Sequence, residues 1–199
     1  VALPTPGVTA NNTHEEVYPG GGADHRGIVH ICMNPRSQYL WDGQSMKAAP
    51  GQNHGAGFIF YEDPQDYTDY LGCLHGLIIA PENGHERLLK ITPGGKSNKI
   101  VSIARDGKNR LLLGGFFGMS MLDGEQVKHL PSQEFPFELG ANAMVKDFRN
   151  NVWIGNNNGF YLFDNKRFVK VENPWFGTLV LSLCLADSNT LFVGGLRGI

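Results

Sequence analysis

The sequence has no apolar run of transmembrane length and no excess of either charge. A membrane-spanning helix needs about 20 consecutive, mostly apolar residues, so no direct membrane insertion of this segment is expected. The formal net charge is −2 at pH 7. That balance lacks the basic surface with which proteins bind nucleic acid or an anionic bilayer, and no nucleic-acid partner is expected.

Cysteine is also scarce, and the three residues Cys32, Cys73 and Cys184 are widely spaced. An odd number without close pairs predicts neither a disulfide framework nor a zinc site. We expect all three to be small buried residues.

Recognisable motifs for a metal or for nucleophilic chemistry are missing as well. The densest polar cluster consists of 14–16 with Asp24, His25 and His30, and its spacing fixes no coordination geometry. The glycine-rich segment 93–97 lacks phosphate-loop spacing and opens no helix, so it is predicted to be a turn. No G-x-S-x-G nucleophile motif occurs. We therefore expect no metal, no cofactor and no catalytic residue.

Glycine, in contrast, is abundant, and it belongs to a repeat. The chain has 26 glycines and 11 prolines, which break it into short elements. A unit of about 40 residues recurs: an apolar strand ending at Asp, a turn, a second strand ending at Gly, and a third strand that begins at Gly. Its aspartates are Asp106, Asp147 and Asp187, and its loop glycines are Gly118, Gly159 and Gly198.

A repeat of this length built from short strands predicts a β-propeller. We expect an all-β fold, a partial propeller of about four to five blades, each a four-stranded antiparallel sheet. The alternative is coincidental alternation in another all-β fold. After an irregular segment at 1–26, the blades are expected at 27–50, 58–92, 100–130, 142–171 and, incomplete, 180–199. The first unit is out of step, because its second strand ends in Asp42-Gly43.

Large apolar side chains of the repeat are expected to fill the gaps between blades. The residues predicted to be buried there are Ile103, Leu112, Val145, Trp153, Leu183 and Phe192.

The chain starts at Val1 and stops at Ile199, where a third strand is due. We expect a piece of a longer protein, forming an open arc rather than a closed ring. Such an arc exposes the faces of its first and last blades, and apolar faces are usually covered. The expected partners are the remainder of the parent chain or a second copy in a homodimer.

Three units carry a family resemblance: IVSIARDGKNRLLLGGFFGMSML, AMVKDFRNNVWIGNNNGFYLFD and VLSLCLADSNTLFVGGLRGI. They resemble two-component regulator propeller repeats, in which an apolar strand and Asp precede Asn-Leu-Trp-Ile-Gly-Thr and a Gly-Leu aromatic strand. The match is good over 100–199, moderate over 58–91 and poor before that. Leu112 and Phe192 replace the Trp, and Gly115, Asn156 and Gly195 replace the Thr.

The resemblance implies a location and a role. Such repeats form the periplasmic sensor domain of membrane-bound hybrid histidine kinases in Bacteroides-like bacteria, where they detect oligosaccharides. The kinase would lie outside this chain. We therefore expect a non-enzymatic, periplasmic ligand-sensing domain with an oligosaccharide or another small ligand as its partner.

Propeller ligands bind where loops of successive blades converge at the mouth of the channel. The turns between second and third strands share one face with the connections between blades. Aromatic rings there suit the apolar side of a sugar, and amides and Arg suit its polar groups. The candidate ligand-binding residues are His75, Phe116, Phe117, Asn156, Asn157 and Arg197. Asn in these turns is also explained by its tolerance of positive φ.

Two other functions remain open from the sequence. A propeller lyase or glycosidase acting on polysaccharide needs a base or paired carboxylates at the mouth. His75 is the one obvious base in the candidate loops, and no carboxylate lies in the equivalent loops. A pure protein-interaction propeller needs only an exposed blade edge.

Overall fold

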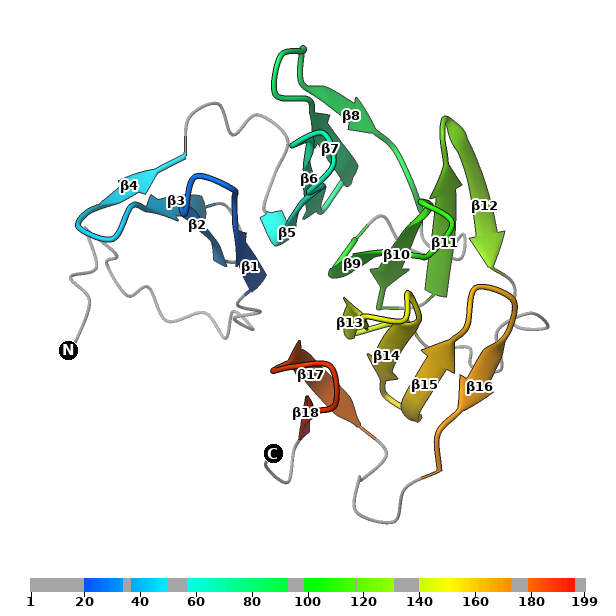
Figure 1. The fold of residues 1–199 in the computed structure, drawn as a ribbon. Helices are drawn as coiled ribbons and strands as arrows, with labels where there is room; N and C mark the ends of the chain where they lie inside the picture. The colour runs from blue at the N-terminus through cyan, green and yellow to red at the C-terminus, as the bar shows by residue number, and fades with distance from the viewer. Residues whose placement is uncertain are drawn as a thin grey trace, which may run out of the picture.

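The fold was analysed in a computed structural model, which describes residues 20–33, 37–49, 57–92, 99–116, 118–130, 140–172 and 179–195. These residues form eighteen strands and no helix, so they contain no helix that could cross a membrane. Four sheets have four antiparallel strands each, and the last sheet has two. The sheets are arranged around a central space like the blades of a propeller (Figure 1). The predicted all-β propeller fold is confirmed.

Each sheet is a meander in chain order, and we number the five sheets as blades 1 to 5. Blade 1 contains β1 (Gly20–Ala23), β2 (Val29–Met33), β3 (Ser37–Trp41) and β4 (Met46–Ala48). Blade 2 contains β5 (Gly57–Glu62), β6 (Asp69–Cys73), β7 (Gly76–Ala80) and β8 (Arg87–Leu89). Blade 3 contains β9 (Ser102–Arg105), β10 (Leu111–Gly115), β11 (Gly118–Asp123) and β12 (Gln126–Leu130). Blade 4 contains β13 (Ala143–Lys146), β14 (Val152–Asn156), β15 (Gly159–Phe163) and β16 (Phe168–Lys170). Blade 5 contains β17 (Val180–Leu185) and β18 (Leu191–Gly195).

The first strand of every blade lies nearest the centre, and we call β1, β5, β9, β13 and β17 the inner strands (Figure 1). Successive inner strands pack beside one another along the chain, from β1 to β17. Each inner strand turns into its second strand on one face of the arc, here named the turn face. The second strand turns into the third on the opposite face, here named the loop face.

The described blades form an open arc (Figure 1), and for the whole chain the open arc stays a prediction. Residues 1–19 and 196–199 lie outside the described part.

The strand β1 was not predicted. β1 lies inside the segment 1–26 that was expected to be irregular, and it is the inner strand of blade 1. Its Gly-Gly-Gly-Ala sequence carries no apolar signal. Glycine suits this position because a Cβ on Gly22 would lie 3.0 Å from the carbonyl oxygen of Phe60 in blade 2, a tight contact. With β1 as the inner strand, Asp24 follows it directly. The first unit therefore has the same register as the other units, contrary to the sequence prediction.

The repeated Asp builds the turn on the turn face. In blade 3, the backbone N–H of Asp106 donates to the carbonyl of Arg110, 2.9 Å away, and a carboxylate oxygen of Asp106 accepts the N–H groups of Lys108 and Arg110. Asp147 does the same for Arg149 and Asn151 in blade 4. The Asp carboxylate accepts hydrogen bonds from the backbone N–H groups of its own turn, and this explains why Asp recurs at the position.

The repeat register shifts by one residue in blade 5. There the N–H of Ala186, rather than of Asp187, donates to the turn carbonyl, that of Thr190, at 3.0 Å. Ala186 is thus the equivalent of Asp106 and Asp147. Asp187 still accepts the N–H of Asn189 at 2.7 Å. The sequence spacing therefore identified the correct turn, but Asp187 lies one residue after the position equivalent to Asp106 and Asp147.

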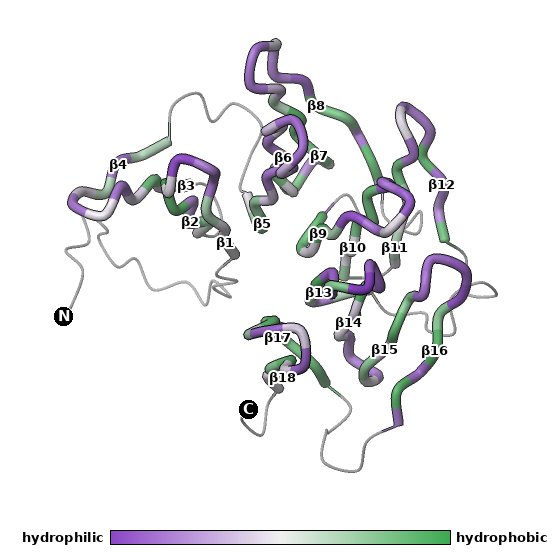
Figure 2. The backbone as a smooth tube through the Cα atoms, viewed as in Figure 1, coloured by the Kyte–Doolittle hydropathy of each residue, from purple (hydrophilic) through white to green (hydrophobic). Residues whose placement is uncertain are grey.

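Three apolar clusters fill the gaps between neighbouring blades from blade 2 to blade 5. Leu112 and Ile103 are buried in them as predicted. Trp153, Val145 and Leu183 are only partly buried. Figure 2 shows the hydrophobic residues along the strands and the hydrophilic residues at the turns.

The prediction that Phe192 is buried is wrong, because its side chain is 51% exposed. The reason is that blade 5 has two strands in the described residues. Cys184 on β17 is likewise exposed, whereas Cys32 and Cys73 are buried as expected.

Candidate functional site

The inner strands of all five blades line a central cavity of about 730 Å³. Its wall is largely apolar, with Phe60, Ile103, Met144 and Leu183 contributed by four different blades. A second cavity of about 580 Å³ opens at the turn face, and we call it the turn mouth. Ile103 and Met144 line both cavities, so the two spaces adjoin one another along β9 and β13.

Of the predicted site residues, Phe116 lines the central cavity. It is half-buried in the turn between β10 and β11, and the ammonium group of Lys99 lies 5.6 Å from its ring centroid. Phe117 and Arg197 lie outside the described residues. His75 is exposed at the equivalent turn of blade 2 and is not among the residues that line either cavity.

Asn156 and Asn157 have different roles in blade 4. Asn156 is completely buried, and its Oδ1 accepts the N–H of Asn158 at 2.7 Å, which stabilises the turn. Asn157 is exposed, and its Oδ1 accepts a hydrogen bond of 2.8 Å from Nδ2 of Asn142.

Asn142, which the sequence analysis missed, links blade 4 to blade 5. Its Nδ2 also donates to the carbonyl of Val180 at 3.0 Å, and Asn142 lines the central cavity. It precedes an inner strand, so its place in the repeat could have identified it.

The turn mouth was not predicted, although it holds more ionisable groups than the central cavity. The backbone N–H and the Nδ1 of His25 bond the two carboxylate oxygens of Glu62, at 2.7 and 2.8 Å. Nε2 of His25 lies 3.9 Å from Glu82. The His25 ring is 4.1 Å, centroid to centroid, from that of Tyr67. These contacts join blades 1 and 2 at the rim.

Tyr67 has an unusual backbone for an aromatic residue. Its φ is +54°, in the left-handed region that a bulky residue rarely adopts. The equivalent turn positions are Gly27, Asn109 and Asn150, which also have positive φ and which tolerate it better. Strain of this kind is often kept where a side chain has a role, and Tyr67 lines the turn mouth with 41% of its surface exposed.

A buried ion pair lies below this rim. The guanidinium of Arg105 in blade 3 pairs with the carboxylate of Asp63 in blade 2. Arg105 also donates to the carbonyl of Asn109 at 2.7 Å and to the hydroxyl of Tyr70 at 3.3 Å. Its Nε has no hydrogen-bond partner among the described residues.

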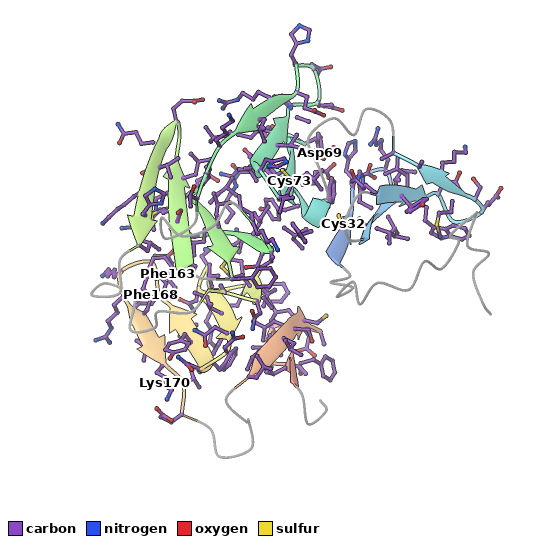
Figure 3. All side chains as sticks on the ribbon, turned by 180° about the vertical axis from the view of Figure 1, so that it is seen from behind. Cys32, Asp69, Cys73, Phe163, Phe168 and Lys170 are labelled. Carbon is purple, nitrogen blue, oxygen red and sulfur yellow. The ribbon has the colours of Figure 1, made fainter. Side chains whose placement is uncertain are left out.

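Asp69, labelled in Figure 3, starts β6 directly opposite Glu62 in β5. Burial, together with the nearby Glu62 carboxylate, raises the pKa of Asp69 to about 6. One of its oxygens, Oδ1, is buried without a hydrogen-bond partner in the described part of the chain.

The buried thiols are poor nucleophiles at neutral pH, because burial raises the pKa of Cys32 to about 12 and raises that of Cys73. Within the described ranges, no three His, Cys, Asp or Glu side chains are placed to hold a metal ion.

Comparison with known proteins shows what the chain is similar to. No protein-family model matches it, and no curated protein matches it in sequence. Among solved structures, it is similar to the extracellular domain of the hybrid two-component system BT3049 from B. thetaiotaomicron, with 14% identity and a TM-score of 0.70 over 92% of this chain and 28% of the other. The corresponding domain of BT4673 from the same organism gives 15% identity and a TM-score of 0.68 over 92% of this chain and 26% of the other.

A lyase has the same fold. Virginiamycin B lyase from Staphylococcus aureus, in a catalytically inactive form with quinupristin, matches with 11% identity and a TM-score of 0.68 over 94% of this chain and 66% of the other. At these identities the comparisons establish the propeller fold. The resemblance expected from the repeats is found in the structures of the sensor domains, and this chain spans about a quarter of their length.

Proposed function

We propose that this chain is part of a periplasmic sensor propeller of a hybrid two-component system and that it binds an oligosaccharide in its central channel. The observation that carries the proposal is the 730 Å³ cavity bounded by all five inner strands. Small-molecule sites have volumes of roughly 300–1,000 Å³ and mostly apolar walls with a few placed polar groups.

The wall has the chemistry that a sugar needs. The half-buried Phe116 supplies aromatic surface, which suits the C–H face of a sugar ring, while Phe58 and Phe60 line the cavity as buried side chains. Asn142 supplies an amide at the loop face. The fold shared with extracellular sensor domains supports the same assignment. The kinase and the other parts of the parent protein would lie outside this chain, which itself is a binding domain without chemistry.

Binding and turnover must be measured together. We expect calorimetric titration with a panel of plant and host oligosaccharides to give binding, and chromatography of the same mixtures to give unchanged sugars. Phe116→Ala should weaken binding about tenfold, the loss of roughly one aromatic contact. Phe148→Ala is the matched control, because Phe148 is 71% exposed and lies outside the central cavity. No binding by any sugar of the panel would overturn the proposal.

A lyase is the second candidate, and the His25–Glu62 pair favours it. A carboxylate that accepts the Nδ1–H of a histidine leaves Nε2 as a base. If the chain is a lyase, product appears with the wild type and disappears with His25→Ala, while sugar binding persists.

A further inference from the structure

The turn mouth contains two cationic side chains that have hydrogen-bond donors without a partner among the described residues. They are Arg105 and Lys146, the last residues of the neighbouring inner strands β9 and β13. Strand pairing shows that both occupy the same level, since Arg105 lies opposite Leu111 and Lys146 opposite Val152, each at the start of its second strand. Both line the cavity of about 580 Å³.

Arg105 is held by three partners, and one of its hydrogen-bond donors has no partner among the described residues. Its side chain is 10% exposed, and its terminal nitrogens bind Asp63, Asn109 and Tyr70. The Nε–H is buried and unpartnered among the described residues. Leaving a buried donor unsatisfied is costly, so an acceptor that enters the mouth gains a preformed partner.

Lys146 is exposed at the rim, with no acid in ion-pair contact in the part of the chain that the structure describes. The acids of the mouth are already engaged. Glu62 uses both oxygens on His25, and Asp24 is bound by Arg26 at 2.9 Å. Lys146 is therefore a cation of the mouth that has no ion-pair partner among the described residues.

The same mouth has a surface for a ring. Tyr61, Tyr67 and Pro64 line it together with His25, and the ring of Tyr67 lies 4.1 Å from that of His25, centroid to centroid. Aromatic and proline faces stack against the apolar side of sugar rings. A volume of about 580 Å³ exceeds what an inorganic anion fills.

We infer that the turn mouth binds the carboxylate of an acidic sugar, a uronic acid residue, one oxygen accepting from Nε of Arg105 and the other from the ammonium of Lys146. The inference rests on the proposed function and adds to it the class of ligand and the end of the channel at which the acid group lies. Charge-assisted hydrogen bonds to a carboxylate are stronger than neutral ones, so the acid group dominates selectivity.

The test uses two ligands with the same sugar chain, one with free carboxylates and one with methyl esters in their place. The 199-residue protein is titrated calorimetrically with trigalacturonate and with its fully methyl-esterified form. We expect the ester to bind at least about tenfold more weakly, the equivalent of one lost charge-assisted bond. Lys146→Met should weaken trigalacturonate about tenfold and leave the ester unchanged. Lys90→Met is the matched control, since Lys90 is exposed after β8 and outside both cavities.

The outcomes separate the inference from the proposed function. Equal binding of acid and ester, or binding of neutral or sulfated oligosaccharides without trigalacturonate, overturns the inference and leaves oligosaccharide sensing standing. Binding of no sugar overturns both. Loss of trigalacturonate binding in Lys90→Met equal to that in Lys146→Met assigns the effect to overall charge and also overturns the inference.

Discussion

Arg105 and Asp63 form a buried ion pair that joins blade 3 to blade 2 at the turn face. The side chains are 10% and 3% exposed, so each charge is compensated mainly by the other and only slightly by water. The same two blades are joined at their outer edges by a second pair, Arg87 and Glu125, whose side chains are largely exposed, with an N–O distance of 2.8 Å. One blade junction therefore contains both a buried and a solvated ion pair.

The first prediction compares these two pairs. Asp63→Asn should lower the free energy of unfolding by about 3–5 kcal/mol, because it leaves the Arg105 charge buried and uncompensated. Glu125→Gln should cost no more than about 1 kcal/mol, because exposed pairs contribute little. Urea denaturation measures both. Similar losses in the two variants would show that burial does not set the strength of this pair.

Trp153 is the subject of the second prediction. Its indole N–H donates to Asp147 at 3.0 Å, and its ring stacks on Phe160 with centroids 5.0 Å apart. Trp153→Ala should cost about 3 kcal/mol, the low end for large aromatic truncations, because the side chain is only partly buried. Phe192→Ala, at a half-exposed site, should cost under about 1 kcal/mol in the same denaturant titration. A larger loss for Phe192 than for Trp153 would contradict the assignment of these side chains.

The third prediction concerns pH and Asp69, which faces Glu62 across the strands and has Asp24, His25 and Arg26 nearby. Its pKa is raised to about 6 in the folded protein, against about 3.9 when unfolded. The folded state therefore binds more protons between these values, and stability is lost as pH rises from about 4 through 6. Asp69→Asn should remove this loss.

The variant should match wild type near pH 4 and exceed it by about 1–2 kcal/mol near pH 7, with solvent screening allowed for. The comparison between the two proteins is necessary because His30 acts in the opposite direction. Burial lowers the pKa of His30, so its contribution to stability falls as pH drops below about 6.5. Urea titrations across this range test the prediction, and a constant difference between the proteins would refute it.

Blade 5 supports a fourth prediction. Leu181 and Phe192 are about half exposed on its two described strands, and apolar faces of this kind tend to be covered. We expect the isolated chain to form a dimer through this face, measurable by light scattering at about tens of micromolar. The double variant Leu181→Lys, Phe192→Glu should be monomeric, whereas Phe148→Ser, which changes an exposed Phe elsewhere, should not. A monomeric wild type would rule out this association.

Much of the fold followed from local pattern. The Asp of each turn, the Gly that closes each second strand and the alternating apolar residues are short-range signals, and they located the strands of blades 2 to 4. The inner strand of blade 1 was not predicted, because β1 consists of Gly20–Ala23 and has no apolar pattern. This strand of three glycines and one alanine pairs with β2 and lies close to Phe60 in the next blade, and no local pattern records that packing.

The same distinction between local pattern and packing applies to the candidate site. Phe116 was named from the sequence because it occupies a repeated turn, and the structure places it in the lining of the central cavity. The turn mouth was missed because its residues are the ones that do not repeat. The last residue of the inner strand differs between the five blades: Ala23, Glu62, Arg105, Lys146 and Leu185. The change from the acid Glu62 to the bases Arg105 and Lys146 was the sequence signal for the turn mouth.

By itself, then, the sequence determined the repeat, the strands that carry an apolar pattern and the Asp turns, because each depends on hydrogen bonds and burial within one blade. The tertiary structure alone decided which strand ends meet. His25 and Glu62, or Asp63 and Arg105, are about 40 residues apart in the chain. They come together because inner strands of successive blades pack side by side around one axis. That packing also leaves Phe192 exposed and Lys146 unpaired among the described residues, since both depend on what the neighbouring blade presents.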